Sequence, residues 1–306
     1  MLGAVLGLGC AATFGANAII TRRGVLRASS HYIATLSILT GPLFFLIVAG
    51  LTGDLFRLDE CPWQATVFLA LSGIIHFVFG RTWGFKSIQL IGSNRAYVVL
   101  GLSPVISIAL AMLAVGETVK PLTALGIIFS LSGPLLTLLK EKRVDRDTTF
   151  RVNEHGKEVD RRTFFVGMLF GLGAAVFWGS SSIFIKLGLE KGGTPVGGSL
   201  IAYLAALIAI SPLFLNREKR REILKPDKRS FQLALFSGLS TNVAQVLRCF
   251  ALKYGSVILI TFMIQTTPLW VLLLSFMFNR KVESFSRWVL LGNALLIVGT
   301  ILVIIS

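Results

Sequence analysis

Ten apolar segments, each long enough to cross a bilayer, follow one another along this 306-residue chain. A stretch of about 20 apolar residues spans the hydrocarbon core as a helix. The segments are continuous rather than alternating, which favours helices over barrel strands. The expected helices cover residues 2–21, 31–51, 63–85, 92–115, 121–139, 164–186, 198–215, 230–251, 257–278 and 285–305. The sequence therefore predicts an all-α integral membrane protein with ten transmembrane helices.

A glycine pattern in the first segment returns in the sixth at a constant offset of 164 residues. Gly7, Gly9, Gly15 and Gly24 recur as Gly171, Gly173, Gly179 and Gly188. Two copies of a module with five crossings, an odd number, must lie upside down relative to each other, as in many secondary transporters. We therefore predict two inverted five-helix repeats, residues 1–139 and 164–306, joined by a charged cytoplasmic linker, residues 140–163.

The net charge of +15 is distributed unevenly between the two sides of the expected bundle. When loops are assigned alternately to two sides, one side holds 24 of the 30 Lys and Arg residues and the side with both termini holds 6. This asymmetry is the positive-inside signal. It predicts cytoplasmic basic loops, both termini outside, and a multi-pass protein of a plasma (inner) membrane. It also accounts for the basic excess without a nucleic-acid partner.

Polar side chains inside the expected helices are the candidates for a substrate site. Asn242, Gln245 and Arg248 step by three along one helix and share a face that must avoid lipid. Arg81 and Arg248 hold related positions in the two halves, and a guanidinium binds a carboxylate or phosphate through two hydrogen bonds. The candidate set is Asn17, Arg81, Trp83, Asn94, Arg95, Tyr97, Trp178, Ser181, Asn242, Gln245, Arg248 and Gln265.

Each of these candidates also has a structural interpretation. The arginines could snorkel to interfacial water. Asn17 and Ser181 could form hydrogen bonds between close-packed helices, and the tryptophan rings could belong to the core. Pro104 and Pro268 lie near the middle of the fourth and ninth helices, where each opens the preceding turn and frees a carbonyl at Leu100 or Ile264. Such a break either lines the substrate site or serves only as a packing kink.

Several functional classes have no matching sequence pattern. All 15 Asp and Glu residues fall in loops or at helix ends, with Glu117 nearest the membrane, so proton-driven efflux of cations is disfavoured. His76 is the titratable alternative inside a helix, and we interpret it as a hydrogen-bonded packing residue. The three cysteines lack metal or redox spacing. No catalytic motif is present, so we expect no enzymatic activity, no metal and no cofactor.

Short motifs in the chain resemble those of a known family. Phe14-Gly15-Ala16-Asn17 and Trp178-Gly179-Ser180-Ser181 resemble the Trp-Gly-Ser-Asn element in the first helix of EamA-type carriers of the drug/metabolite transporter superfamily. Ser103-Pro104-Val105, followed by Gly116-Glu117, resembles that family's Pro-Val run and terminal Gly-Glu. The second half departs from the pattern with Asn279-Arg280-Lys281. Family members usually have cytoplasmic termini, the reverse of the charge-based prediction.

The resemblance implies a central site lined mainly by the first, third, fourth, sixth, eighth and ninth helices, with alternating access by rocking of bent helices. The arginines and the missing acids favour a small polar cargo, with amino acids and other carboxylates ahead of cations. The expected partners are this solute and the lipid bilayer; the oligomeric state is left open. The competing hypotheses are a membrane-embedded lipid-handling enzyme and a non-transporting membrane scaffold.

Overall fold

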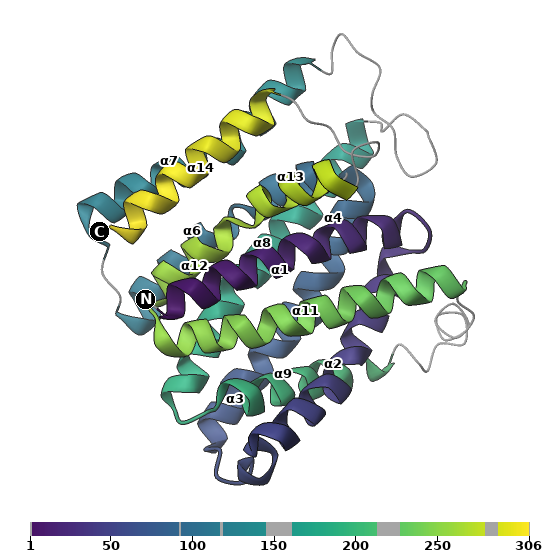
Figure 1. The fold of residues 1–306 in the computed structure, drawn as a ribbon, viewed down its shortest axis with the longest axis vertical. Helices are drawn as coiled ribbons and strands as arrows, with labels where there is room; N and C mark the ends of the chain where they lie inside the picture. The colour runs from purple at the N-terminus through teal and green to yellow at the C-terminus, as the bar shows by residue number, and fades with distance from the viewer. Residues whose placement is uncertain are drawn as a thin grey trace.

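The computed structural model describes residues 2–91, 93–116, 119–144, 161–212, 227–278 and 287–305. Every regular element within these ranges is helical, as the sequence predicts. Five stretches are long and apolar enough to cross a membrane: Leu2–Val25, Ser30–Thr52, Trp63–Ile91, Arg162–Glu190 and Val257–Phe278. Figure 1 shows that α1 begins and α14 ends at the same end of the bundle.

The first half contains α1 (Leu2–Val25), α2 (Ser30–Thr52), η1 (Asp54–Arg57), α3 (Trp63–Gly73), η2 (Ile74–Arg81), α4 (Thr82–Ile91), α5 (Ser93–Leu100), α6 (Ser103–Leu110), η3 (Ala111–Val115) and α7 (Pro121–Val144). The second half contains α8 (Arg161–Glu190), α9 (Pro195–Ile210), α11 (Lys228–Tyr254), α12 (Val257–Gln265), α13 (Thr267–Phe278) and α14 (Arg287–Ile304). The third expected helix is longer than predicted and continues through α4 to Ile91.

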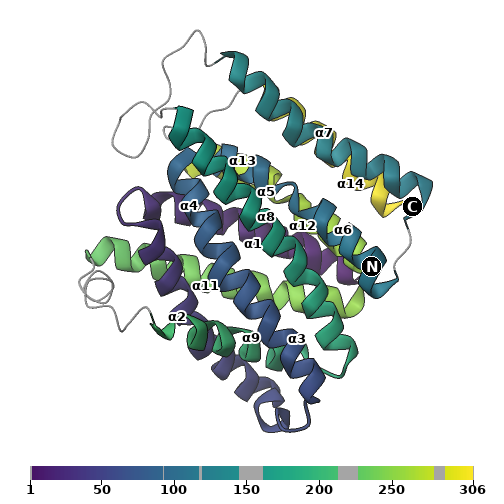
Figure 2. The ribbon, with the colours of Figure 1, turned by 180° about the vertical axis from the view of Figure 1, so that it is seen from behind.

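The two halves interlock instead of packing as separate bundles. Helix α1 packs along α11 and along the pair α12–α13, and α8 packs in the corresponding way along α4 and along the pair α5–α6. Figure 2 shows α8 beside α4 and α6 on the rear of the bundle. Helices α7 and α14 pack chiefly against each other at one edge. Each half therefore completes the core of the other.

Two glycines at equivalent positions allow these close approaches. A Cβ at Gly15 would lie 2.5 Å from the Cβ of Trp270 in α13. A Cβ at Gly179 would lie 2.6 Å from the carbonyl oxygen of Ser103 and 2.9 Å from the Cβ of Ile106 in α6. The glycines, like Ile106 and Trp270, are 164 residues apart, so the repeat in the sequence corresponds to a repeat in the contacts.

The basic side chains of Arg22 and Lys186 also form equivalent contacts in the two halves. Near the end of α1, Arg22 donates a hydrogen bond to the carbonyl of Ile88 at 3.2 Å. Near the end of α8, Lys186 donates to the carbonyl of Leu252 at 3.3 Å. Each pair is separated by 66 residues, and each cation lies near the C-terminal end of its partner helix, where positive charge is favourable.

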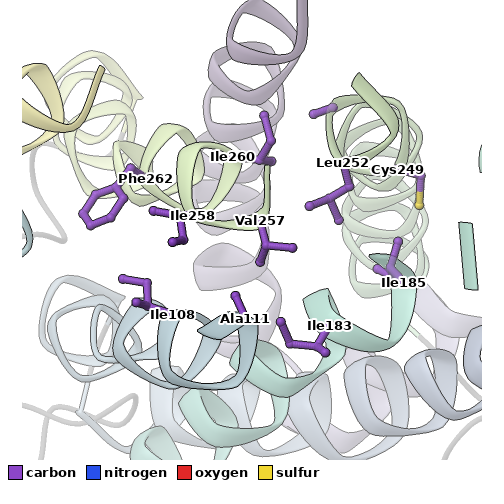
Figure 3. Packing of buried hydrophobic residues seen from close by; sticks show 11 residues of the cluster. Ile108, Ala111, Ile183, Ile185, Cys249, Leu252, Val257, Ile258, Ile260 and Phe262 are labelled. Carbon is purple, nitrogen blue, oxygen red and sulfur yellow. The ribbon is translucent and has the colours of Figure 1, made fainter. Parts of the chain in front are cut away.

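Apolar clusters close the bundle towards both ends. Figure 3 shows one of them, in which side chains from α6, η3, α8, α11 and α12 point toward one another. It includes Ile108, Ile183, Leu252, Val257 and Ile260. A second cluster lies where α1 ends and α4 ends, and it includes Val25, Ile33, Phe85, Ile88 and Ile91. The polar residues described below lie between the two.

Candidate functional site

Two membrane helices break at the prolines that the sequence singled out. The fourth expected helix stops at Leu100 and restarts as α6, one residue before Pro104. The ninth stops at Gln265 and restarts as α13, one residue before Pro268. The Ile264 carbonyl, which the proline was expected to free, accepts a hydrogen bond from the Thr267 hydroxyl at 2.6 Å. The breaks place polar backbone in the middle of the membrane, where protein groups satisfy it.

The segment η2 is a π-helix within the third membrane helix. Residues five apart in an α-helix point about 140° away from each other. In a π-helix the backbone bonds run from i to i+5, so residues five apart share a face. His76 and Arg81 are five apart and lie in this segment, and both line the same cavity. The π-helix thus brings an imidazole and a guanidinium to one site.

A central cavity of about 110 Å³ lies between the helix breaks and the π-helix. Its walls combine basic, amide, hydroxyl and aromatic side chains from both halves, and no acidic residue is among them. The lining residues are Phe14, Asn17, His76, Arg81, Phe85, Tyr97, Leu100, Gly101, Ser103, Pro104, Ser107, Trp178, Ser182, Thr241, Arg248, Thr261, Ile264, Gln265, Thr267 and Pro268.

Arg248 connects three helices at this cavity. It is 4% exposed. One terminal nitrogen lies 3.0 Å from Nδ1 of His76, and the other donates to Ser182 Oγ at 2.6 Å and Ser181 Oγ at 3.0 Å. These partners are neutral. Among the described residues no carboxylate pairs with this guanidinium, so its charge is available to an anion in the cavity.

Arg81 is the second buried cation and is 2% exposed. It donates to Ser37 Oγ and to the Tyr203 hydroxyl, each at 3.0 Å. Its guanidinium carbon lies 4.7 Å from the centroid of the Phe77 ring, a cation–π contact. The snorkelling interpretation therefore does not describe either arginine, because both heads are held inside the bundle by protein groups.

Asn17 combines a hydrogen bond between helices with a position on the cavity wall. Its side-chain oxygen accepts a hydrogen bond from Ser237 Oγ at 2.8 Å, which joins α1 to α11. It also lines the cavity. Gln265 behaves similarly, because it lines the cavity and its amide nitrogen donates to the carbonyl of Gly101 at 3.0 Å.

The remaining candidates divide into three groups. Tyr97 and Trp178 line the cavity. Ser181, Gln245 and Asn242 are buried behind it: Ser181 and Gln245 contact His76, and Asn242 donates to Thr40 Oγ1 at 3.1 Å. Asn94 and Arg95 belong to α5, and their side chains fall outside the described part of the structure.

Trp83 departs from the expectation. Its side chain is 36% exposed, and its ring packs edge-on against Phe170 and Phe177 instead of lining the cavity. Gly173 provides the space for this ring, because a Cβ there would collide with it. Trp83 lies two residues beyond the end of the π-helix, whose altered register the sequence did not reveal.

Sequence reasoning missed several lining residues. Thr241, Ser107 and Thr261 are small hydroxyl residues that apolar helices also use for packing, so the sequence does not distinguish them as site residues. His76 was interpreted as a packing residue, yet it lines the cavity and contacts Arg248, Gln245 and Ser181. The sequence contained one signal for this role. Arg248 and Gln245 belong to the polar stripe on the eighth expected helix, and His76 is the titratable side chain inside a helix that they could contact.

Comparisons with known proteins show a family match and a shared fold. The model of the EamA-like transporter family matches residues 1–139 and 165–305. A protein of known crystal structure shares the fold, with a TM-score of 0.73 over 99% of this chain and 97% of that one, at 16% sequence identity. No curated protein matches the chain in sequence.

Proposed function

Because this chain belongs to the EamA-like transporter family, we propose that it carries a small polar solute through its central cavity by alternating access. Amino acids and other carboxylates are the favoured cargo. The observation that carries this proposal is the pair of buried arginines, Arg81 and Arg248, lining one cavity without a carboxylate among its walls. A buried cation is costly unless it is paired, and a solute carboxylate would supply the missing charge.

The cavity also suits a solute with both polar and apolar parts. Trp178, Tyr97 and Phe14 offer ring surfaces, and Asn17, Thr241 and Gln265 offer hydrogen-bonding groups. At about 110 Å³ the space suits a small metabolite. Cations are disfavoured because two positive groups already face the cavity.

The proposed topology has ten crossings in two inverted repeats. We count α3–η2–α4, α5–α6–η3 and α12–α13 as one crossing each, and the other long helices singly. The equivalent contacts of Gly15 and Gly179, and of Arg22 and Lys186, support this repeat. Apolar clusters lie towards both ends of the cavity, so rocking of the broken helices would open one cluster at a time.

Counterflow in proteoliposomes tests the cargo class. Purified protein is reconstituted and preloaded with L-lactate, L-alanine or L-glutamate, and with choline as a cationic comparison. We expect uptake of the labelled form of at least one carboxylate and none of choline. Counterflow of choline alone would contradict the anion site, and no counterflow of any solute would favour the scaffold or lipid-handling hypotheses.

Arginine variants connect that activity to the cavity. Arg248→Ala removes the donors to His76, Ser181 and Ser182, so carboxylate counterflow should be lost while membrane insertion is retained. Arg248→Lys keeps the charge but loses the planar fork, and should retain only part of the activity. Arg57→Ala is the matched control, because Arg57 is exposed and pairs with Glu60 at 2.9 Å outside the cavity. Equal rates in all three variants would exclude Arg248 from the substrate site.

A further inference from the structure

His76 separates two cavities. On one side it lines the central cavity together with Arg248. On the other it lines a smaller cavity of about 10 Å³ together with Gln245, Ser199 and Cys249. Arg248 contacts Nδ1 at 3.0 Å, and the Gln245 amide lies 2.6 Å from Nε2. The two ring nitrogens therefore have different partners and face different spaces.

The hydrogen-bond partners define where the ring carries its proton. Arg248 and Ser181 Oγ each lie 3.0 Å from Nδ1. A guanidinium has only donors, so its hydrogen bond with Nδ1 requires this nitrogen to accept, and we infer that the charged donor determines the tautomer. The single proton of the neutral ring is then on Nε2. The structure places the Gln245 amide nitrogen 2.6 Å from Nε2. With this amide rotated by 180° about its last bond, as the Nε2–H form requires, its oxygen accepts the proton. Arg248 thus holds His76 in the neutral form protonated at Nε2.

The other groups around His76 do not supply a competing acid. From α11 it faces Arg248 and, across the small cavity, Cys249. Arg81 is on its own helix, and Tyr203 of α9 binds that arginine. The remaining titratable groups are Cys10 of α1, near Arg248, and Tyr97 of α5, on the wall of the same central cavity. Helix α8 contributes the neutral Trp178 and Ser181. No carboxylate is among these described neighbours.

We propose that His76 binds a proton when a solute carboxylate takes over the Arg248 donors, so that the solute and the proton are carried together. This inference rests on the proposed carriage of carboxylates. The carboxylate accepts the N–H groups of Arg248, and the lone pair of Nδ1 is released. A proton from the aqueous phase binds that lone pair, and the new N–H points to the carboxylate. For a solute with one net negative charge, such as L-lactate or L-glutamate, the proton balances that charge and the net charge of the cavity is unchanged.

Gln245 has a positioning role in this exchange. The Nε2 proton is present in both the neutral and the charged ring, so the Gln245 oxygen accepts it throughout. The ring therefore keeps its orientation while the protonation of Nδ1 changes. The stacked Trp178 ring, whose centroid lies 5.9 Å from that of His76, restricts the same motion.

Nitrogen-15 NMR of histidine-labelled protein tests the switch directly. The chain has three histidines, and the signal lost in His76→Asn assigns the one of interest. Without solute at neutral pH, His76 should give the nitrogen signals of the neutral ring with its proton on Nε2. Addition of the carboxylate that gives counterflow (L-lactate, L-alanine or L-glutamate) should produce the imidazolium signal. An imidazolium signal before the solute is added, or a neutral ring with its proton on Nδ1, would overturn the proposal.

A variant imitates the bound carboxylate without any solute. Arg248→Glu replaces the donors by an acceptor next to Nδ1, so His76 should be an imidazolium at neutral pH. Unchanged helical circular dichroism would show that this variant is folded. If it is unfolded, the solute titration of the wild-type protein decides alone. A neutral His76 in a folded Arg248→Glu protein would contradict the proposal.

Transport measurements distinguish proton-coupled uptake of the solute from transport of the solute alone. Proteoliposomes containing a trapped pH-sensitive dye report proton entry during uptake of the same carboxylates. In the wild-type protein, uptake should acidify the lumen and should be driven by an inward proton gradient. His76→Asn keeps an acceptor for Arg248 but cannot take up a proton. It should lose the gradient-driven uptake and the acidification of the lumen that accompanies each solute taken up, even where like-for-like counterflow is reduced.

The outcomes are distinguishable. Counterflow of a carboxylate without proton entry would overturn the coupling and leave the proposed function intact. Acidification of the lumen during uptake by His76→Asn, in the same ratio to solute as in the wild-type protein, would contradict the coupling. Absence of carboxylate counterflow in the wild-type protein would overturn the proposed function and the coupling with it.

Discussion

The side-chain amide nitrogen of Gln265 donates a hydrogen bond to the carbonyl oxygen of Gly101 at 3.0 Å, and these two residues hold the same position in the two halves of the chain. Each lies where a membrane helix breaks before a proline. Gly101 has no side chain, so the symmetric pair can form only one such bond. The break between α5 and α6 therefore depends on the second half for its polar partner.

Replacement of Gln265 by an apolar residue should destabilise the protein. Gln265→Leu would remove the donor to the buried carbonyl of Gly101, and leaving such a group unpaired costs about 1–3 kcal/mol. Thermal unfolding in detergent should show a lower midpoint. Gln64→Leu is the matched control: Gln64 is exposed at the start of α3, so its substitution should change stability by less than about 0.5 kcal/mol. Equal midpoints for the two variants would contradict the role of this bond.

Removal of the Tyr203 hydroxyl should destabilise the protein. Tyr203→Phe keeps the stacking on Phe45 and Phe77 but removes the acceptor for Arg81. A hydrogen bond to a charged group contributes about 1.5–3 kcal/mol, so the unfolding midpoint should fall. Tyr254→Phe changes an exposed residue and should have little effect. The same midpoint in both variants would show that Arg81 does not need this partner.

Two helical glycines should respond oppositely to alanine. A Cβ at Gly73 would collide with the backbone of Ala202, where α3 crosses α9, so Gly73→Ala should cost about 1–3 kcal/mol through overpacking. A Cβ at Gly50 in α2 would meet no atom within 4 Å. Gly50→Ala should be neutral or stabilising by up to about 1 kcal/mol, because alanine favours helix. Unfolding midpoints measured in the same detergent compare the two, and a reversed order would refute the close crossing of α3 and α9.

The orientation in the membrane has a direct assay. The excess of Lys and Arg in the loops opposite the termini predicts termini outside and basic loops in the cytoplasm. Alkaline phosphatase fused after Ser306 should therefore be active, and green fluorescent protein at the same place should be dark. The reverse result would place the termini in the cytoplasm, as is usual for the family that the chain resembles.

The sequence by itself determined the features that depend on local chemistry. Apolar length defines membrane helices because lipid leaves backbone groups no other partner. The breaks before Pro104 and Pro268 follow from the missing N–H of proline. The glycine repeat revealed two related halves, since a duplicated pattern needs no tertiary information to be seen. Most of the polar residues it selected with described side chains line the cavity or contact a residue that does.

Only the tertiary structure decided which of those residues meet. His76 and Arg248 are 172 positions apart, and their side chains meet because the fold places η2 of one half and α11 of the other around the same cavity. The π-helix, which brings His76 and Arg81 to one face and is followed by the outward-facing Trp83, shifts the register of the side chains by its wider turn. No spacing rule for an α-helix predicts that shift, because it arises where the two halves pack against each other.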